Sequence, residues 1–142
     1  MAASAARLPA GTIHPLHAVL LASTLPLFLG GLLGDLRYAG TAEPQWSNFA
    51  AWLIAGAMVF TGFALLWSLV ALSRIGRIGG WPAACSGLLL VTFILGLINS
   101  FVHARDAWGI MPAAPILSAV VTVLAAAAVW VGFSTLRRGE RA

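Results

Sequence analysis

Four long stretches of the chain carry almost no charged residues, and short polar segments separate them. The apolar stretches cover residues 16–33, 49–72, 81–102 and 110–136. Each is about as long as a helix that crosses roughly 30 Å of hydrocarbon, because an α-helix rises about 1.5 Å per residue. The pattern therefore predicts four membrane-spanning helices within a single transmembrane domain that takes up residues 1–142.

The segments between these stretches are short and cover residues 35–47, 73–80 and 104–109. Connections of this length make consecutive helices antiparallel neighbours. The expected fold class is all-α, an integral membrane four-helix bundle with up-down-up-down topology. A cleaved signal peptide is the alternative for the first stretch, with residues 40–42 as its cleavage site. However, this apolar run is longer than the apolar region of such a peptide, and only Arg7 supplies a basic flank.

The composition supports a membrane location and argues against several classes of protein. Apolar residues make up 61% of the chain and charged residues 8%, whereas a soluble domain has about 25% charged residues. The formal net charge of +4 does not indicate a nucleic-acid partner, because the arginines are scattered at the ends of apolar stretches. The single cysteine, Cys85, allows no disulfide within the chain. The lipid bilayer is therefore the first expected partner, and no nucleic acid is expected.

Charged residues are divided unequally between the two sides of the predicted bundle. The side of the N-terminus holds six arginines and one acidic residue: Arg7, Arg74, Arg77, Arg137, Arg138, Arg141 and Glu140. The opposite side holds two arginines and three acidic residues: Arg37, Arg105, Asp35, Glu43 and Asp106. Because arginine-rich ends stay in the cytoplasm, both termini are expected to be cytoplasmic in a bacterial inner-membrane protein. No charge is expected within a span, which argues against an intramembrane ion or proton relay.

The first candidate site lies where the first apolar stretch begins. His14 and His17 are three residues apart, so they share one face of a helix. Imidazoles at this place are able to ligate a metal or a haem iron, or to donate a hydrogen bond to a quinone carbonyl. Nearby arginines suit haem propionates or phospholipid headgroups. The alternative is a helix start at the membrane surface, with both histidines solvated among headgroups.

The second candidate site lies at the opposite end of the predicted bundle. Asn99, His103 and Asp106 follow an i, i+4, i+7 pattern and share a face if the third helix continues that far, and Arg105 flanks them. A carboxylate beside a histidine fixes its tautomer and raises its basicity, which suits a proton-coupled quinone site or an axial haem ligand. The alternative is a polar helix end held together by pairs of arginine and aspartate.

His17 and His103 are the candidate metal ligands of the two sites. The predicted topology separates them by most of the membrane, so one chain does not supply both axial ligands of a single haem. Any haem b would have one histidine ligand, completed by another group or by a partner subunit.

Several motifs of the chain resemble a widespread bacterial family of small predicted membrane proteins that is known only as a domain of unknown function. The resemblance covers nearly the whole chain. Its motifs are His14-Pro15-Leu16-His17, Trp46, Ala50-Ala51-Trp52 and the stretch from Asn99 to Trp108. Many relatives have a proline where this chain has Ala18 and a third histidine where it has Ala22. This departure argues against a metal or haem site made of three histidines.

The resemblance implies a redox neighbourhood, because relatives occur beside or fused to Rieske-type iron–sulfur or cytochrome c domains, and beside sugar-dehydrogenase-like proteins. The leading hypothesis is a cytoplasmic-membrane subunit that serves an electron-transfer assembly, as an anchor and as a haem b or quinone site. The alternative is a structural accessory subunit of a larger membrane complex, without a cofactor. No nucleotide-binding, zinc-protease or serine-hydrolase motif occurs in the chain, so it is not expected to be catalytic on its own.

The expected protein partners are other membrane or periplasmic redox subunits. A homodimer is a further candidate, because Gly30 and Gly34, and likewise Gly96 and Ser100, have the small-x-x-x-small spacing that lets helix backbones approach closely. The same residues serve equally well for contacts within one bundle.

Overall fold

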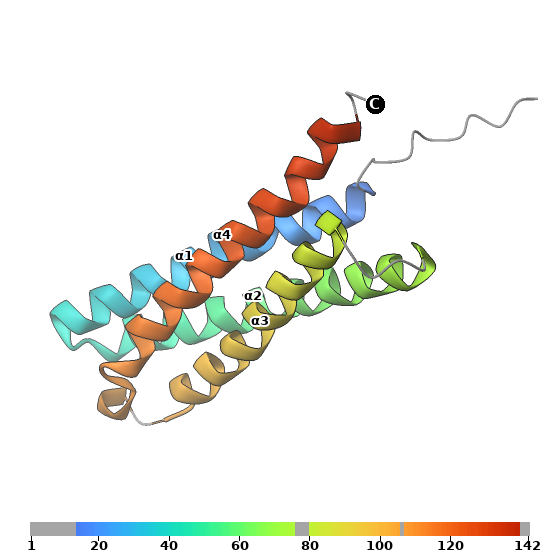
Figure 1. Ribbon diagram of the computed structural model, residues 1–142. Helices are drawn as coiled ribbons and strands as arrows, with labels where there is room; N and C mark the ends of the chain where they lie inside the picture. The colour runs from blue at the N-terminus through green and yellow to red at the C-terminus, as the bar shows by residue number, and fades with distance from the viewer. Residues whose placement is uncertain (1–13, 76–79, 106, 140–142) are drawn as a thin grey trace, which may run out of the picture.

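The computed structural model describes residues 14–75, 80–105 and 107–139, which form four long helices and one short 3-10 helix (Figure 1). The helices are α1 (Pro15–Thr41), α2 (Pro44–Ile75), α3 (Gly80–His103), η1 (Ala107–Ile110) and α4 (Ala113–Gly139). All four α-helices are long and apolar enough to cross a membrane. The prediction of an all-α four-helix bundle is therefore confirmed.

The four helices pack in a square. Helices α1 and α3 each pack along α2 and α4, so α1 and α3 stand diagonally across the bundle. Helix α1 begins at the end of the bundle where α4 finishes, on the right in Figure 1, and the turn from α1 to α2 lies at the opposite end. We call these two ends the His14 end and the Asp35 end.

Helix α1 is longer than the sequence pattern predicted. It was expected to stop near residue 33 but continues to Thr41, and the expected segment 35–47 shrinks to a connection of Ala42 and Glu43. The polar residues after position 33 do not end the helix, because Asp35 and Tyr38 lie on its buried face. The helix ends where Ala42 adopts a left-handed conformation, φ 55°, and donates its N–H to the Tyr38 carbonyl at 2.8 Å.

This extension corrects a second expectation, that no charged residue lies within a span. Asp35 lies inside the candidate span Pro15–Thr41, six residues before its end, which is about 9 Å along the helix axis. A charged residue does not by itself indicate a loop, because a helix tolerates one on a face that is buried against other helices.

Three apolar clusters fill the interior of the bundle. From the Asp35 end, the first is the Tyr38 cluster of Tyr38, Val102, Ile110 and Ala114. The second is the Phe28 cluster of Phe28, Ile54, Ala57, Val121 and Ala125. The Leu21 cluster of Leu21, Ala64, Leu65, Cys85, Leu89 and Ala128 follows toward the His14 end. A polar layer separates the Tyr38 cluster from the Phe28 cluster, since Asp35 lies between Phe28 and Tyr38 on the buried face of α1.

Small residues of the spans serve contacts within this bundle. A Cβ atom at Gly34 would lie 3.1 Å from the Ala50 Cβ atom, and one at Gly96 would lie 2.5 Å from the Met58 sulfur. These glycines therefore permit the close approach of neighbouring helices in one chain. A homodimer stays a prediction.

Candidate functional site

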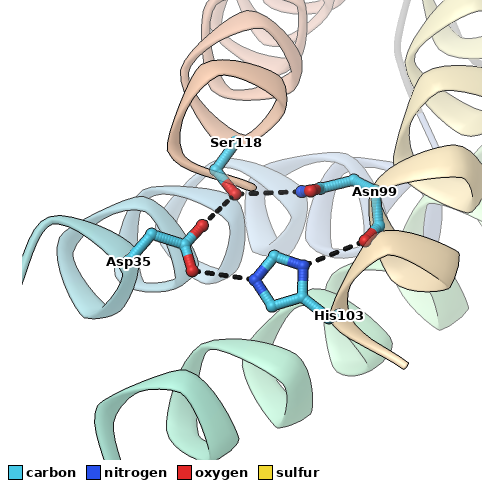
Figure 2. Close-up of polar contacts among 4 residues, drawn as sticks. All are labelled: Asp35, Asn99, His103 and Ser118. Carbon is cyan, nitrogen blue, oxygen red and sulfur yellow. Dashed lines mark hydrogen bonds and ion pairs between the residues drawn. The ribbon is translucent and has the colours of Figure 1, made fainter. Parts of the chain in front are cut away.

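Four polar residues form a closed ring of hydrogen bonds near the Asp35 end, and the ring closes through the main-chain carbonyl of Asn99 (Figure 2). The ring consists of Asp35 from α1, Asn99 and His103 from α3, and Ser118 from α4. Asp35, Asn99 and Ser118 are 0% exposed, and the His103 side chain is 2% exposed. We call these four residues the polar ring. Its members are held within the spans and away from both water and lipid.

Helical spacing places each member on an inner face. Asn99 and His103 are four residues apart on α3, so their side chains lie on the same face. On α4, Ser118 continues the line of buried positions that runs from Ala114 through Val121. Because α1 and α3 stand diagonally, the hydrogen bond between Asp35 and His103 crosses the centre of the bundle. The ring thereby joins α1 to α3 and α4, which are distant from it in the sequence.

The hydrogen bonds of His103 determine how many protons the pair of His103 and Asp35 holds. Its Nδ1 atom lies 2.9 Å from the main-chain carbonyl oxygen of Asn99. That oxygen only accepts hydrogen bonds, so Nδ1 carries a proton and donates it. Its Nε2 atom lies 2.8 Å from Asp35 Oδ1. That contact needs one proton, either on an imidazolium that faces a carboxylate or on a carboxylic acid that faces a neutral imidazole. In both forms the pair is neutral overall, which suits a site inside the membrane.

The other half of the ring fixes the orientation of the Asn99 amide. Ser118 donates its hydroxyl proton to Asp35 Oδ2 at 2.5 Å. Since a serine has only one such proton, Ser118 accepts from Asn99 Nδ2 at 2.9 Å, and the amide turns its NH₂ group toward it. The Asn99 Oδ1 atom is then left buried without a hydrogen-bond partner among the described residues. An added donor at this atom would be strongly stabilised in so apolar a setting.

The structure brings together only part of the second predicted site. Asn99 and His103 share the ring as their spacing predicted, but the carboxylate beside His103 belongs to Asp35. Asp106 lies outside the described residues. Arg105 is exposed and belongs to none of the contacts of the ring. The ring's remaining member, Ser118, was missed.

The first predicted site has a different geometry. His14 precedes α1 as its N-cap, with its Nδ1 atom accepting from the Leu16 N–H at 3.2 Å. His17 is buried, and its ring lies nearly parallel to the Trp67 ring, with 6.2 Å between the centroids. The His14 ring also packs on Trp67, with the centroids 4.8 Å apart. The Nδ1 atom of His17 has no hydrogen-bond partner among the described residues.

The structure separates His17 and His103 as the topology predicted; whether either binds haem or a metal stays a prediction. His17 and Asp35, the partner of His103, are 18 residues apart on α1, about 27 Å along its axis, so the two histidines lie at opposite ends of the bundle. Both ring nitrogens of His103 are engaged in hydrogen bonds, so it has no free lone pair for a metal ion. Within the described ranges, no three His, Cys, Asp or Glu side chains are grouped so as to hold a metal ion.

The comparisons with known proteins give a membrane family and no named relative. No curated protein and no solved structure matches the chain. One protein family matches residues 13–138, which include all four candidate spans. The chain is thus a multi-pass membrane protein, and it belongs to the family described as Predicted membrane protein (DUF2231).

Proposed function

We propose that this protein is a multi-pass subunit of an electron-transfer assembly in the bacterial inner membrane, where it anchors redox partners and holds a quinone near the Asp35 end. One observation carries the proposal, the pair of Asp35 and His103 that is buried inside a membrane-spanning bundle. Ionisable side chains in such places mark substrate or proton sites more often than they serve packing alone.

The donors and acceptors of the polar ring suit a quinone better than they suit a haem. A bound quinone supplies electron transfer that is coupled to the uptake and release of protons. The unpartnered Asn99 Oδ1 would accept a hydrogen bond from the hydroxyl of its reduced form. The neighbouring pair of Asp35 and His103 holds a proton close to that oxygen. The redox proteins implied by the family resemblance support the choice of an electron-transfer assembly.

A second candidate function is a structural accessory subunit without a cofactor. The observation that favours it is the closure of the polar ring, whose hydrogen bonds run from one member to the next. The Tyr38 cluster and the Phe28 cluster lie on its two sides. In this alternative the ring fixes the positions of α1, α3 and α4 relative to one another, and its proton never moves.

Asp35→Asn separates the two functions. The asparagine amide is able to donate to a neutral His103 Nε2 and to accept from Ser118, so the ring stays closed but loses the shared proton. We expect the variant to fold with a thermal midpoint close to that of the wild type. We also expect quinol-dependent electron transfer in membrane vesicles to fall at least tenfold, about 1.4 kcal/mol on the barrier.

The matched control for this experiment is Thr92→Val. Thr92 is buried in α3, and its hydroxyl donates only to the Leu88 carbonyl of its own helix. Its loss should change neither electron transfer nor the quinone that is extracted with the purified protein. Electron transfer at the wild-type rate in Asp35→Asn, with quinone content unchanged, would overturn the proposal and favour the structural subunit.

A further inference from the structure

An apolar groove runs along the outside of the bundle at the His14 end, between α1 and α2. Its volume is about 660 Å³, within the range of about 300–1,000 Å³ that is typical of small-ligand sites. Its walls include Leu16 and Leu20 from α1, and Phe63, Leu66 and Trp67 from α2. Leu16, Phe63 and Leu66 are each more than half exposed, so the groove opens toward the lipid.

One charged side chain, Arg74, stands among the residues that line the groove. It lies in the last turn of α2 and is exposed. The sequence has no acidic residue between Glu43 and Asp106, and Arg74 makes no ion pair within the described part of the chain. A guanidinium without a counter-ion among the described residues therefore stands at the end of an apolar groove.

We propose that this groove binds one acyl chain of an anionic phospholipid, with the phosphate of its headgroup on Arg74. From Phe63 to Arg74 the groove follows α2 for 11 residues, about 16 Å. Its apolar part matches the acyl chain of a phospholipid, and its charged end at Arg74 matches the headgroup. Guanidinium binds phosphate through paired hydrogen bonds. A quinone is uncharged, so it offers Arg74 hydrogen-bond acceptors but no counter-ion.

The groove is independent of the polar ring, because the two lie at opposite ends of the bundle. Packing of His14 against Trp67 holds one wall of the groove in place, which gives His14 a structural role there. The simpler account is an arginine that extends to the membrane surface and meets any lipid without preference. Selectivity for the anionic headgroup distinguishes the two accounts.

The test is native mass spectrometry of the delipidated protein with phosphatidylglycerol or phosphatidylcholine of the same acyl chains. The wild type should retain phosphatidylglycerol about fivefold better, since one arginine near the membrane surface contributes about 1 kcal/mol. Arg74→Gln should remove the preference. Arg105→Gln, an exposed arginine at the Asp35 end, should retain it.

A second variant tests the groove itself. Ala71 is exposed and lines the groove, so Ala71→Phe fills it without disturbing the core and should lower retention of phosphatidylglycerol severalfold. The proposal fails if the wild type shows no preference, if Arg74→Gln keeps it, or if Ala71→Phe binds as the wild type does. It also fails if ubiquinone displaces the lipid equally well in the wild type and in Arg74→Gln.

Discussion

The two ends of the bundle differ in where their ionisable side chains lie. Asp35 and His103 form a pair in the core at the Asp35 end, whereas His14 and Arg74 are exposed at the His14 end. In the interior near the His14 end, the uncharged Ser68 and Ser86 form a hydrogen bond between α2 and α3. Asp35, His103 and Ser118 find hydrogen-bond partners within the polar ring, and Asn99 finds them except at its Oδ1 atom, which has none among the described residues. At the other end His14 caps its own helix, and Arg74 is exposed beside an apolar groove. In the interior of a membrane protein, a polar group needs a partner from another helix, whereas at the rim it meets headgroups and water. The cost of removing a polar group should therefore differ sharply between the two ends.

The largest effect is expected for Asp35→Leu. This change leaves His103 Nε2 and Ser118 Oγ without their acceptor in the core, and breaking a buried pair in this way costs about 3–5 kcal/mol of unfolding free energy. Unfolding in detergent, followed by circular dichroism, measures the loss. Glu43→Ala is the control at the same end: Glu43 is exposed, and losing its bonds to Gln45 and Trp46 should cost less than about 1 kcal/mol. Equal losses in both variants would contradict the contrast between inward and outward groups.

Apolar packing is expected to be the main support of the His14 end. A side chain at Gly132 would collide with Leu21, which is fully buried, so Gly132→Val should lower the unfolding free energy by about 1–3 kcal/mol. Gly87→Val is the matched control, because a Cβ atom at Gly87 meets open space on the exposed side of α3. The same unfolding measurement compares them, and a loss as large in the control would show that helix propensity rather than packing is at work.

A smaller effect is expected for Ser118→Ala. The alanine removes the acceptor of Asn99 Nδ2 and one donor to Asp35, and a hydrogen bond between helices in a membrane is worth about 1 kcal/mol. Thr122→Val, one turn away, removes a buried hydroxyl that donates to the Ser118 carbonyl of its own helix, and should cost less. If the two variants unfold at the same denaturant concentration, the link between helices contributes nothing beyond a local hydrogen bond.

The smallest effect is expected for His17→Phe. The Nδ1 atom of His17 is buried and has no hydrogen-bond partner in the part of the chain that the structure describes, and a phenyl ring keeps the packing against Trp67. The unfolding free energy should stay within about 0.5 kcal/mol of the wild type, or rise, because an unsatisfied polar atom is removed. His103→Phe is the comparison. It should lower the unfolding free energy by about 3 kcal/mol or more, because it leaves the buried Asp35 carboxyl without its histidine partner. A loss of that size in His17→Phe would show that His17 holds a ligand in the membrane.

The sequence predicted the four spans because long apolar runs have few other uses. It did not predict where α1 ends, because Asp35 and Arg37 have the appearance of a loop when each residue is considered alone. The spacing of Phe28, Gly31, Asp35 and Tyr38 shows why the helix continues: all four follow one buried face. A charge in register with such a face is a sign of a polar contact in the core, and periodicity carries that information where composition does not.

The sequence likewise predicts one part of the candidate site and not the other. Helical spacing was enough to place Asn99 and His103 together, because both lie within one turn of α3. Their partners lie on other helices: Asp35 is 68 residues from His103, and Ser118 is 19 residues from Asn99 but on the far side of the turn to α4, so spacing within one helix predicts neither. Which helices stand diagonally depends on packing of the whole bundle. The nearest carboxylate in the sequence, Asp106, was therefore assigned the place that Asp35 occupies beside His103.

The distance in sequence between the members of the polar ring also sets an order of events during synthesis. Ser118 follows Asp35 by 83 residues, which takes about 4–17 seconds at about 5–20 residues per second. For the first 68 residues of that interval the carboxylate has neither of its partners, although α1 and α2 are already joined by their two-residue connection; His103 comes first and Ser118 follows. The ring closes only when α3 and α4 have entered the membrane. A chain that stops before α4 leaves Asp35 without Ser118, so the core is complete only after α4 has been added.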